Sequence, residues 1–191
     1  MRCRLPTLRP PSPVAEPGRN AGALLLSAES IAARVEAMAD QIAPRIDDDA
    51  VAVCLLTGGL WFAADLMRAL AVRGRQPLFD ALWLSSYADK RKSLGRVQVR
   101  AGLQRPVEGR MVLLIDDVVD SGLSLVEAVR IAREAGAVSV LSAAFARKPW
   151  PTPRGIEPDF VGWEAPDRFL AGYGLDEAGR LRGLPGIHAL D

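Results

Sequence analysis

Short apolar runs alternate with helical patterns along the chain, and this alternation constrains the fold more than any other feature. The run VAVCLL, residues 51–56, is too short for a buried helix and is rich in residues that favour strands. The run MVLLI, residues 111–115, is the clearest buried strand. Further strands are predicted over residues 79–87, 96–103, 138–144, 159–163 and 186–190.

Helical patterns fill the segments between several of these strands. Apolar residues from Ile31 to Ile42 share one helical face, with Ser27 as the N-cap and Pro44 closing the segment. Two more helices are predicted over residues 60–74 and 122–136. Strands that alternate with helices predict an α/β fold, with a mostly parallel central sheet flanked by helices on both faces.

The composition is that of one domain without a strong charge bias. Of the 191 residues 49% are hydrophobic, and 24 Lys and Arg against 23 Asp and Glu leave a net charge of +1. This balance gives no reason to expect a nucleic-acid partner. No apolar stretch approaches the roughly 20 residues of a membrane span. Cys3 and Cys54 form neither a disulfide framework nor a metal cluster, so we expect a reduced, cytoplasmic protein.

Acidic, hydroxylated and glycine residues follow the strand at 111–115. They read Asp116-Asp117-Val118-Val119-Asp120-Ser121-Gly122-Leu123-Ser124. In an open α/β sheet, ligands bind outside the carboxyl ends of the strands. The N–H groups of residues 120–124 stand at a predicted helix start, where backbone amides and the helix dipole bind anions. The hydroxyls of Ser121 and Ser124 add donors, and Gly122 permits close backbone approach.

The two strand-end acids complete a site suited to a phosphorylated sugar. Asp116 and Asp117 can accept hydrogen bonds from ribose hydroxyls or hold a hydrated magnesium ion. The alternative is that Asp120 and Ser121 only cap the helix, while Asp116 and Asp117 are solvated. We favour the site, because the apolar strand, the paired acids and the Asp-Ser-Gly-x-Ser turn occur together.

The segment LLIDDVVDSGLS resembles the phosphoribosyl-pyrophosphate signature of the type I phosphoribosyltransferases. Three more segments are similar to the hypoxanthine-guanine branch of that family: CLLTGGLWFAADLMRAL, LWLSSY and DFVGWEAPDRFLAGYGLDEAGRLRGLPGI. The resemblance runs from about Leu25 onward. It implies a single domain over residues 21–191, with a core at about 45–150. A small hood would come from about 155–191 and part of the N-terminal segment. Separately, the prolines in residues 5–20 prevent a helix or a strand ladder, so we expect residues 1–20 to be a disordered or loosely attached tail.

The resemblance also implies roles for the acidic segment. Asp120 matches the acid near purine N7, which acts as the general base. Asp116 and Asp117 match the pair that faces the ribose hydroxyls and the metal. Residues 120–124, including Leu123, match the loop that binds the 5′-phosphate.

Residues nearer the C-terminus match the purine and pyrophosphate sites of the family. Lys148 matches the lysine that donates to the purine 6-oxo group, and Phe169 matches the aromatic ring stacked on the base. Leu170 matches a residue whose backbone reads the purine edge. Asp176 matches a second magnesium contact, and Arg182 matches an arginine that binds pyrophosphate. Singly, Lys148 could be a solvated lysine and Phe169 a core residue. Asp176 and Arg182 could form an ordinary surface ion pair. The joint occurrence of these residues at the family spacing favours the functional roles.

Two loops depart from the family pattern. Residues 57–59 match the first pyrophosphate loop, yet Thr57 stands before Gly58 where the family commonly has a lysine. Ser86 and Tyr87 match the pair that opens a mobile loop over residues 88–95, which carries the charged run 90–92 in place of small residues. We expect this loop to close over the substrates. His188 matches no catalytic position, so we assign it to structure.

The activity that the resemblance implies is magnesium-dependent purine salvage. The 5-phosphoribosyl group of phosphoribosyl pyrophosphate would pass to N9 of hypoxanthine or guanine, giving IMP or GMP and pyrophosphate. One alternative is a sister enzyme that prefers xanthine. Another is a regulator that senses phosphoribosyl pyrophosphate without turning it over. The resemblance also implies a homo-oligomer, either a dimer or a tetramer.

Overall fold

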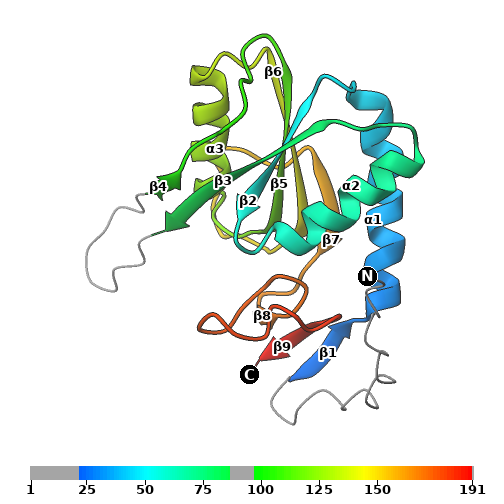
Figure 1. Ribbon diagram of the computed structural model, residues 1–191. Coiled ribbons are helices and arrows are strands. Elements are labelled where there is room, and N and C mark those ends of the chain that lie inside the picture. The colour runs from blue at the N-terminus through cyan, green and yellow to red at the C-terminus, as the bar shows by residue number, and fades with distance from the viewer. Residues whose placement is uncertain (1–21, 87–96, 191) are drawn as a thin grey trace, which may run out of the picture.

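The computed structural model describes residues 22–86 and 97–190, which form a large sheet and a small one (Figure 1). The large sheet has six strands in the order β4-β3-β2-β5-β6-β7, all parallel except β4. Its strands are β2 (Val51–Leu56), β3 (Leu78–Ser86), β4 (Val97–Ala101), β5 (Met111–Val119), β6 (Ser139–Arg147) and β7 (Phe160–Glu164). The predicted α/β fold with a mostly parallel central sheet is confirmed.

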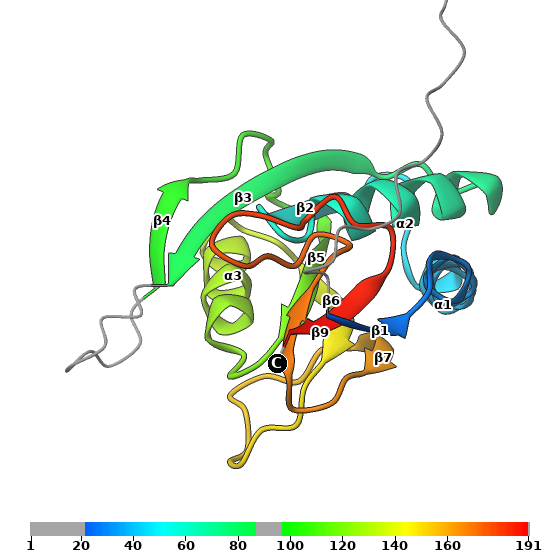
Figure 2. The same cartoon turned by 90° about the horizontal axis from the view of Figure 1, so that it is seen from below.

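Helices cover both faces of the large sheet, as Figure 2 shows in the view from below. On one face α1 (Ala28–Ile42) packs against β7, and α2 (Leu60–Val72) packs against β2 and β5. On the other face α3 (Leu123–Glu134) contacts β5 and β6. Each face therefore buries its own apolar cluster, so the central strands are buried on both sides.

The start of the first helix follows the sequence prediction. The backbone before α1 is extended at Ser27, and the Ser27 hydroxyl oxygen accepts the N–H of Ser30 at 3.3 Å. The helix ends at Ile42, and a short 3-10 helix, η1 (Ala43–Arg45), contains Pro44. A proline here fits the first turn of a short helix, because its missing N–H would have had no partner.

The most consequential correction to the sequence prediction concerns β5. We expected this strand to stop at Ile115, before the two acids, but it continues to Val119. The reason is its neighbour β6, which pairs with β5 residue by residue as far as Val119 and Arg147. Asp116 and Asp117 are therefore held in a strand at the edge of the site.

The small sheet is the predicted hood, and it joins the two ends of the described chain. Its order is β1-β9-β8, with antiparallel pairing throughout. The strands are β1 (Ala23–Leu26), β8 (Phe169–Ala171) and β9 (Ile187–Leu190). The sequence did not indicate β1 or β8 as strands, because four and three residues are too few to show a period. His188, which we assigned to structure, is buried in β9.

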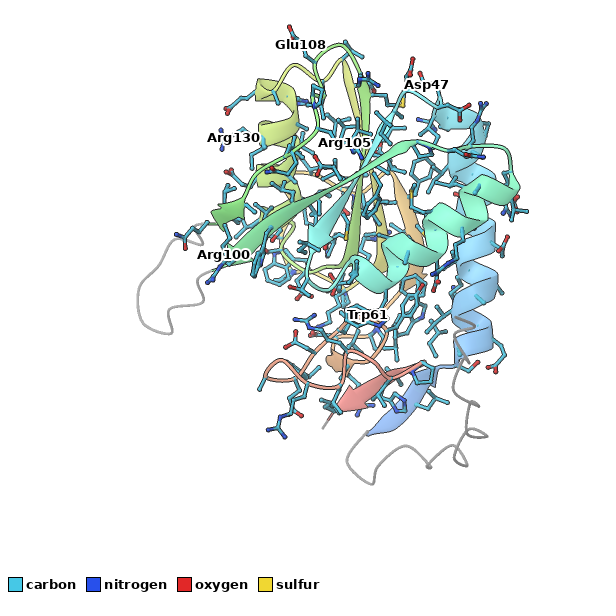
Figure 3. The ribbon with its side chains drawn as sticks, in the orientation of Figure 1. Asp47, Trp61, Arg100, Arg105, Glu108 and Arg130 are labelled. Carbon is cyan, nitrogen blue, oxygen red and sulfur yellow. The ribbon has the colours of Figure 1, made fainter. Side chains whose placement is uncertain are left out.

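The hood is attached to the core through buried aromatic and apolar side chains. Phe145 of β6 lies between Phe62 of α2 and Tyr173, with ring centroids 5.5 Å and 5.0 Å apart. The Tyr173 hydroxyl also donates to Asp65 of α2 at 3.0 Å. Trp61, at the start of α2, lies at the boundary between the two sheets (Figure 3). These contacts fix the hood against the carboxyl end of the large sheet.

Two of the predictions fall on residues that the structure does not describe. The tail over residues 1–20 and the loop over residues 88–95 both lie outside the described ranges. Among the helices that are described, none is long and apolar enough to cross a membrane.

Candidate active site

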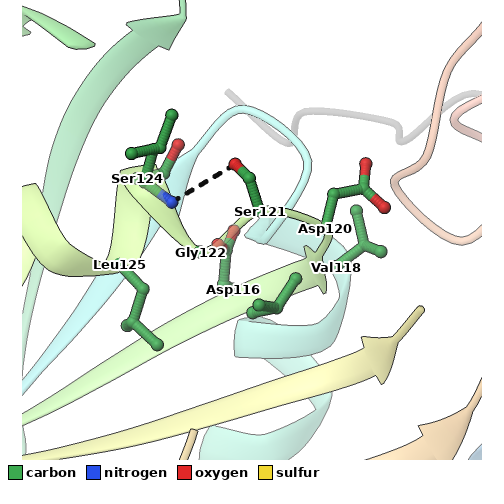
Figure 4. Close-up of a pocket in the computed structure, with 9 residues that line it drawn as sticks. Asp116, Val118, Asp120, Ser121, Gly122, Ser124 and Leu125 are labelled. Carbon is green, nitrogen blue, oxygen red and sulfur yellow. Dashed lines mark hydrogen bonds between the residues drawn. The ribbon is translucent and has the colours of Figure 1, made fainter. Parts of the chain in front are cut away.

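A pocket lies where β5 ends and α3 begins, and its lining is the predicted phosphate loop. Residues 116 and 118–125 surround it (Figure 4). Gly122 is the N-cap of α3, with a φ of 78°, a conformation that glycine adopts without strain. Gly122 has no side chain with which to cap the helix, but the Ser121 hydroxyl oxygen accepts the N–H of Leu123 at 3.4 Å. The first amides of a helix have no partner within the helix, so they are suited to an anion.

Asp116 and Asp117 form a tightly coupled acidic pair beside this pocket. Asp116 is only 9% exposed, and its Oδ1 accepts the N–H of Asp117 at 3.1 Å. Burial and the neighbouring Asp117 charge raise the pKa of Asp116 well above its ordinary value. Burial also raises the pKa of Asp117, against the opposing charge of Arg182. A bound cation would relieve this repulsion, so the pair is electrostatically prepared for one.

Glycine packing brings the first loop against the second acid. The Leu56–Thr57 peptide bond that opens this loop is cis. A Cβ on Gly58 would lie 1.9 Å from Oδ2 of Asp117, and one on Gly174 would lie 2.2 Å from the Gly58 carbonyl oxygen. The loop at 57–59 is therefore enclosed between the acidic pair and the segment that follows β8.

Asp120 and Lys148 are neighbours at the ends of two paired strands. Lys148 Nζ lies 3.6 Å from Asp120 Oδ1. The N–H of Lys148 donates to the carbonyl of Val119 at 3.1 Å, which extends the ladder between β5 and β6 by one residue. Half of the Asp120 side chain is exposed, whereas Lys148 is mostly covered. A carboxylate and an ammonium group thus point into the same space.

The hood supplies an exposed ring and a buried neighbour. Phe169, the first residue of β8, is 54% exposed, which is unusual for a phenylalanine in a strand. Leu170 is buried in the core and pairs with Ala189 of β9.

Asp176 and Arg182 are paired with one another, as the alternative of a surface ion pair predicted. Arg182 Nη2 lies 2.5 Å from Asp176 Oδ1. The other oxygen of Asp176 accepts the N–H of Gly179 at 2.6 Å, and Arg182 also donates to the carbonyl of Gly174. Among the described residues no group of three or more His, Cys, Asp or Glu side chains is arranged to hold a metal.

The structure thus brings Asp120 next to Lys148, Asp117 next to Gly58, and Asp176 next to Arg182. Two of the predicted residues cannot be placed in this way. Ser86 ends β3, but its side chain is not described, and Tyr87 lies outside the described ranges. Sequence reasoning also missed Arg154, whose Nε donates to the carbonyl of Asp120 at 2.6 Å and whose Nη2 donates to the carbonyl of Lys148. Nothing in its sequence context distinguishes it from a solvated arginine.

Comparison with known proteins matches residues 25–178 to the family described as the phosphoribosyl transferase domain. The chain is 36% identical over 168 residues to the hypoxanthine-guanine phosphoribosyltransferase of Bacillus subtilis, covering 87% of this chain and 92% of that protein. Its identity to the Aquifex aeolicus enzyme of the same name is 34%, covering 88% and 94%.

Solved structures give a matching result. A hypoxanthine phosphoribosyltransferase from Staphylococcus aureus is similar with a TM-score of 0.81 at 28% identity, covering 90% of this chain and 92% of that one. The Trypanosoma cruzi hypoxanthine phosphoribosyltransferase in complex with the product IMP has a TM-score of 0.82 at 26% identity, covering 93% and 98%.

We predict that Gly58→Ala displaces the Asp117 carboxylate, because the added Cβ would lie 1.9 Å from its oxygen. Overpacking of this kind costs about 1–3 kcal/mol in the free energy of unfolding, measurable by urea denaturation. Gly102→Ala is the matched control, since nothing lies within 4 Å of its added Cβ. A Gly58→Ala variant as stable as the control, with Asp117 unmoved in its crystal structure, would contradict this packing.

Proposed function

The chain belongs to the phosphoribosyltransferase family, and from this premise we propose that it makes IMP or GMP from phosphoribosyl pyrophosphate and hypoxanthine or guanine. The C1–O bond to pyrophosphate breaks as purine N9 forms its bond to C1. Relatives at 36% and 34% identity over most of the chain carry the name hypoxanthine-guanine phosphoribosyltransferase. The observation that carries the proposal is the placement of Asp120 3.6 Å from Lys148, beside the pocket at the start of α3.

The phosphate loop would hold the sugar by its 5′-phosphate. The amides at the start of α3 and the hydroxyls of Ser121 and Ser124 line the pocket. They are fixed by the helix before the ligand arrives, so little ordering is required on binding. The nearby Asp116 and Asp117 would then accept hydrogen bonds from the ribose hydroxyls.

Asp120 and Lys148 would read adjacent atoms of the purine. N7 and O6 lie side by side on one edge of guanine. The Asp120 carboxylate can accept a hydrogen bond and the Lys148 ammonium group can donate one, and these two groups stand 3.6 Å apart. Asp120 would accept the proton at N7, while Lys148 would donate to O6, so the ion pair between them would be exchanged for two contacts to the base. Phe169 offers an open ring face on which the purine can stack.

The acids fit a magnesium ion that arrives with the substrate. Magnesium usually binds through one or two carboxylates, with phosphates and waters completing its coordination. The repelling Asp116–Asp117 pair and Asp176 provide carboxylates of this kind. When bound, magnesium would offset the charge that develops on the leaving pyrophosphate. Arg182 would meet that pyrophosphate once its pairing with Asp176 opens.

We further propose that the chain forms a homo-oligomer. Phe79 and Trp83 of β3 are 38% and 43% exposed, while the alternating Leu82 and Leu84 are buried in the cluster that faces α3. The two aromatic side chains therefore stand on the opposite face, the one that carries α2. Exposed Leu60 starts that helix. Exposed apolar side chains on one face favour contact with a second copy.

The function is tested by an activity panel with phosphoribosyl pyrophosphate and hypoxanthine, guanine, xanthine or adenine. We expect nucleotide and pyrophosphate from the first two bases, and no product when a chelator removes magnesium. Faster turnover of xanthine would favour the sister enzyme. Binding of phosphoribosyl pyrophosphate without turnover of any base would favour the regulator. Full activity without any divalent metal would exclude the metal-binding roles.

Asp120→Asn is expected to lower kcat by about 10²–10⁴-fold, the usual contribution of a general base. The amide keeps the size of the side chain but cannot accept the N7 proton. Binding of phosphoribosyl pyrophosphate, measured by calorimetry, should change little, because the loop amides remain. Unchanged kcat in this variant would remove Asp120 from the mechanism.

Lys148→Ala is expected to raise KM for hypoxanthine and guanine and to narrow their advantage over adenine. The lysine donates to an oxo group, whereas adenine presents an amino group, so donor would face donor. Sites built around such a hydrogen bond discriminate by about 10⁴–10⁵-fold. Steady-state kinetics with the four bases measure the change, with Lys148→Arg as the charge-preserving comparison. A solvated lysine would leave the base preference of Lys148→Ala unaltered.

A further inference from the structure

Arg154 is nearly buried directly behind the site, although it lines no part of the pocket. Its side chain is 7% exposed, and its stem packs against Gly122, where an added Cβ would lie 3.4 Å from Arg154 Cδ. The guanidinium uses all three nitrogens. Nε donates to the carbonyl of Asp120 at 2.6 Å, and Nη2 donates to the carbonyl of Lys148. Nη1 lies 3.1 Å from Oε1 of Glu157.

These contacts connect the two residues that would read the purine. Asp120 follows β5 and Lys148 follows β6, so one planar group joins the ends of two adjacent strands. The guanidinium holds its donors in a fixed plane, so it sets the separation and orientation of both carbonyls together. Glu157 orients the guanidinium and is itself held by Arg147, whose Nη1 lies 3.2 Å away.

The contact with Asp120 also affects the phosphate loop. In a trans peptide the C=O and the following N–H point in opposite directions. When Arg154 holds the Asp120 carbonyl on one side, the N–H of Ser121 must point away from Arg154. A charged donor on that carbonyl also polarises the peptide group, which makes the same N–H a stronger donor. Arg154 can therefore orient and strengthen an amide of the anion site without touching the anion.

We propose that Arg154 is a positioning residue, which fixes Asp120 and Lys148 relative to one another and to the Ser121 amide. This inference rests on the proposed function, because it concerns how the same site discriminates and turns over its base. Loss of the guanidinium would let the two side chains drift apart, and a displacement of about 1 Å at a reacting centre can cost on the order of 10²-fold in rate.

The informative variants are Arg154→Lys and Arg154→Gln. Lysine retains the charge and its attraction to Glu157, so the protein is expected to fold, but a single ammonium cannot reproduce the planar bridge between two carbonyls. We expect kcat to fall by about 10–100-fold in both variants, KM for phosphoribosyl pyrophosphate to rise, and the preference for hypoxanthine over adenine to narrow. If Arg154 were merely structural, its substitution would lower only the fraction of protein that is folded and active. KM and base preference would then stay unchanged.

Arg130→Lys is the matched control. Arg130 lies on α3 (Figure 3), where its guanidinium pairs with Glu127 at 2.6 Å and Glu134 at 2.5 Å. The substitution removes the same planar group from a double ion pair on the outer surface, about two turns along the helix from the pocket. Its kinetics should match those of the wild type. A second measurement is chemical rescue of Arg154→Ala, where guanidinium ion should restore turnover more than methylammonium at equal concentration.

The outcomes separate this inference from the proposed function. If the wild-type protein does not make nucleotide from any of the four purines, the proposed function fails first. If the wild type is active, Arg154→Lys kinetics equal to those of Arg130→Lys would overturn the positioning role. Equal rescue of Arg154→Ala by the two cations, or none by either, would also overturn it. Reduced kcat with altered base preference and selective guanidinium rescue would establish it.

Discussion

The register between β5 and β6 is the constraint on which the site depends. The two strands pair in parallel from Met111 and Ser139 as far as Val119 and Arg147. Asp120 directly follows β5 and Lys148 directly follows β6, so the two residues lie opposite one another just beyond the paired strand ends. A slip of one residue would reverse the faces of the strand's side chains and separate this pair.

The hood and the glycine contacts make this edge of the sheet into an enclosed site. The acidic pair at 116 and 117 sits on one strand, and Gly58 lets the neighbouring loop approach it closely. Gly174 allows the segment after β8 to rest on that loop in turn. The hood's position is set by Phe145, which contacts aromatic rings on both sides. Segments that are far apart in the sequence therefore pack against one another at this edge of the sheet.

Sequence patterns predicted the central sheet, because buried parallel strands appear as unbroken apolar runs. They also indicated the phosphate loop, where unusual residue types follow such a run. They did not predict that β5 continues through Asp116 and Asp117, because that depends on pairing with β6 rather than on the acids themselves. Nor could they reveal the role of Arg154, because its contact with Asp120 depends on how segments distant in the sequence fold together. The roles assigned to individual side chains stay predictions.

The pairing of β1 with β9 has a consequence for the order in which the molecule is built. Residues 23–26 leave the ribosome before any strand of the large sheet, whereas residues 187–190 leave after all of them. Because β9 is the middle strand of the small sheet, β1 and β8 have no partner until it arrives. During translation the large sheet, which carries the proposed phosphate loop, can therefore form first. The small sheet, which would contribute Phe169 to base recognition, is completed last.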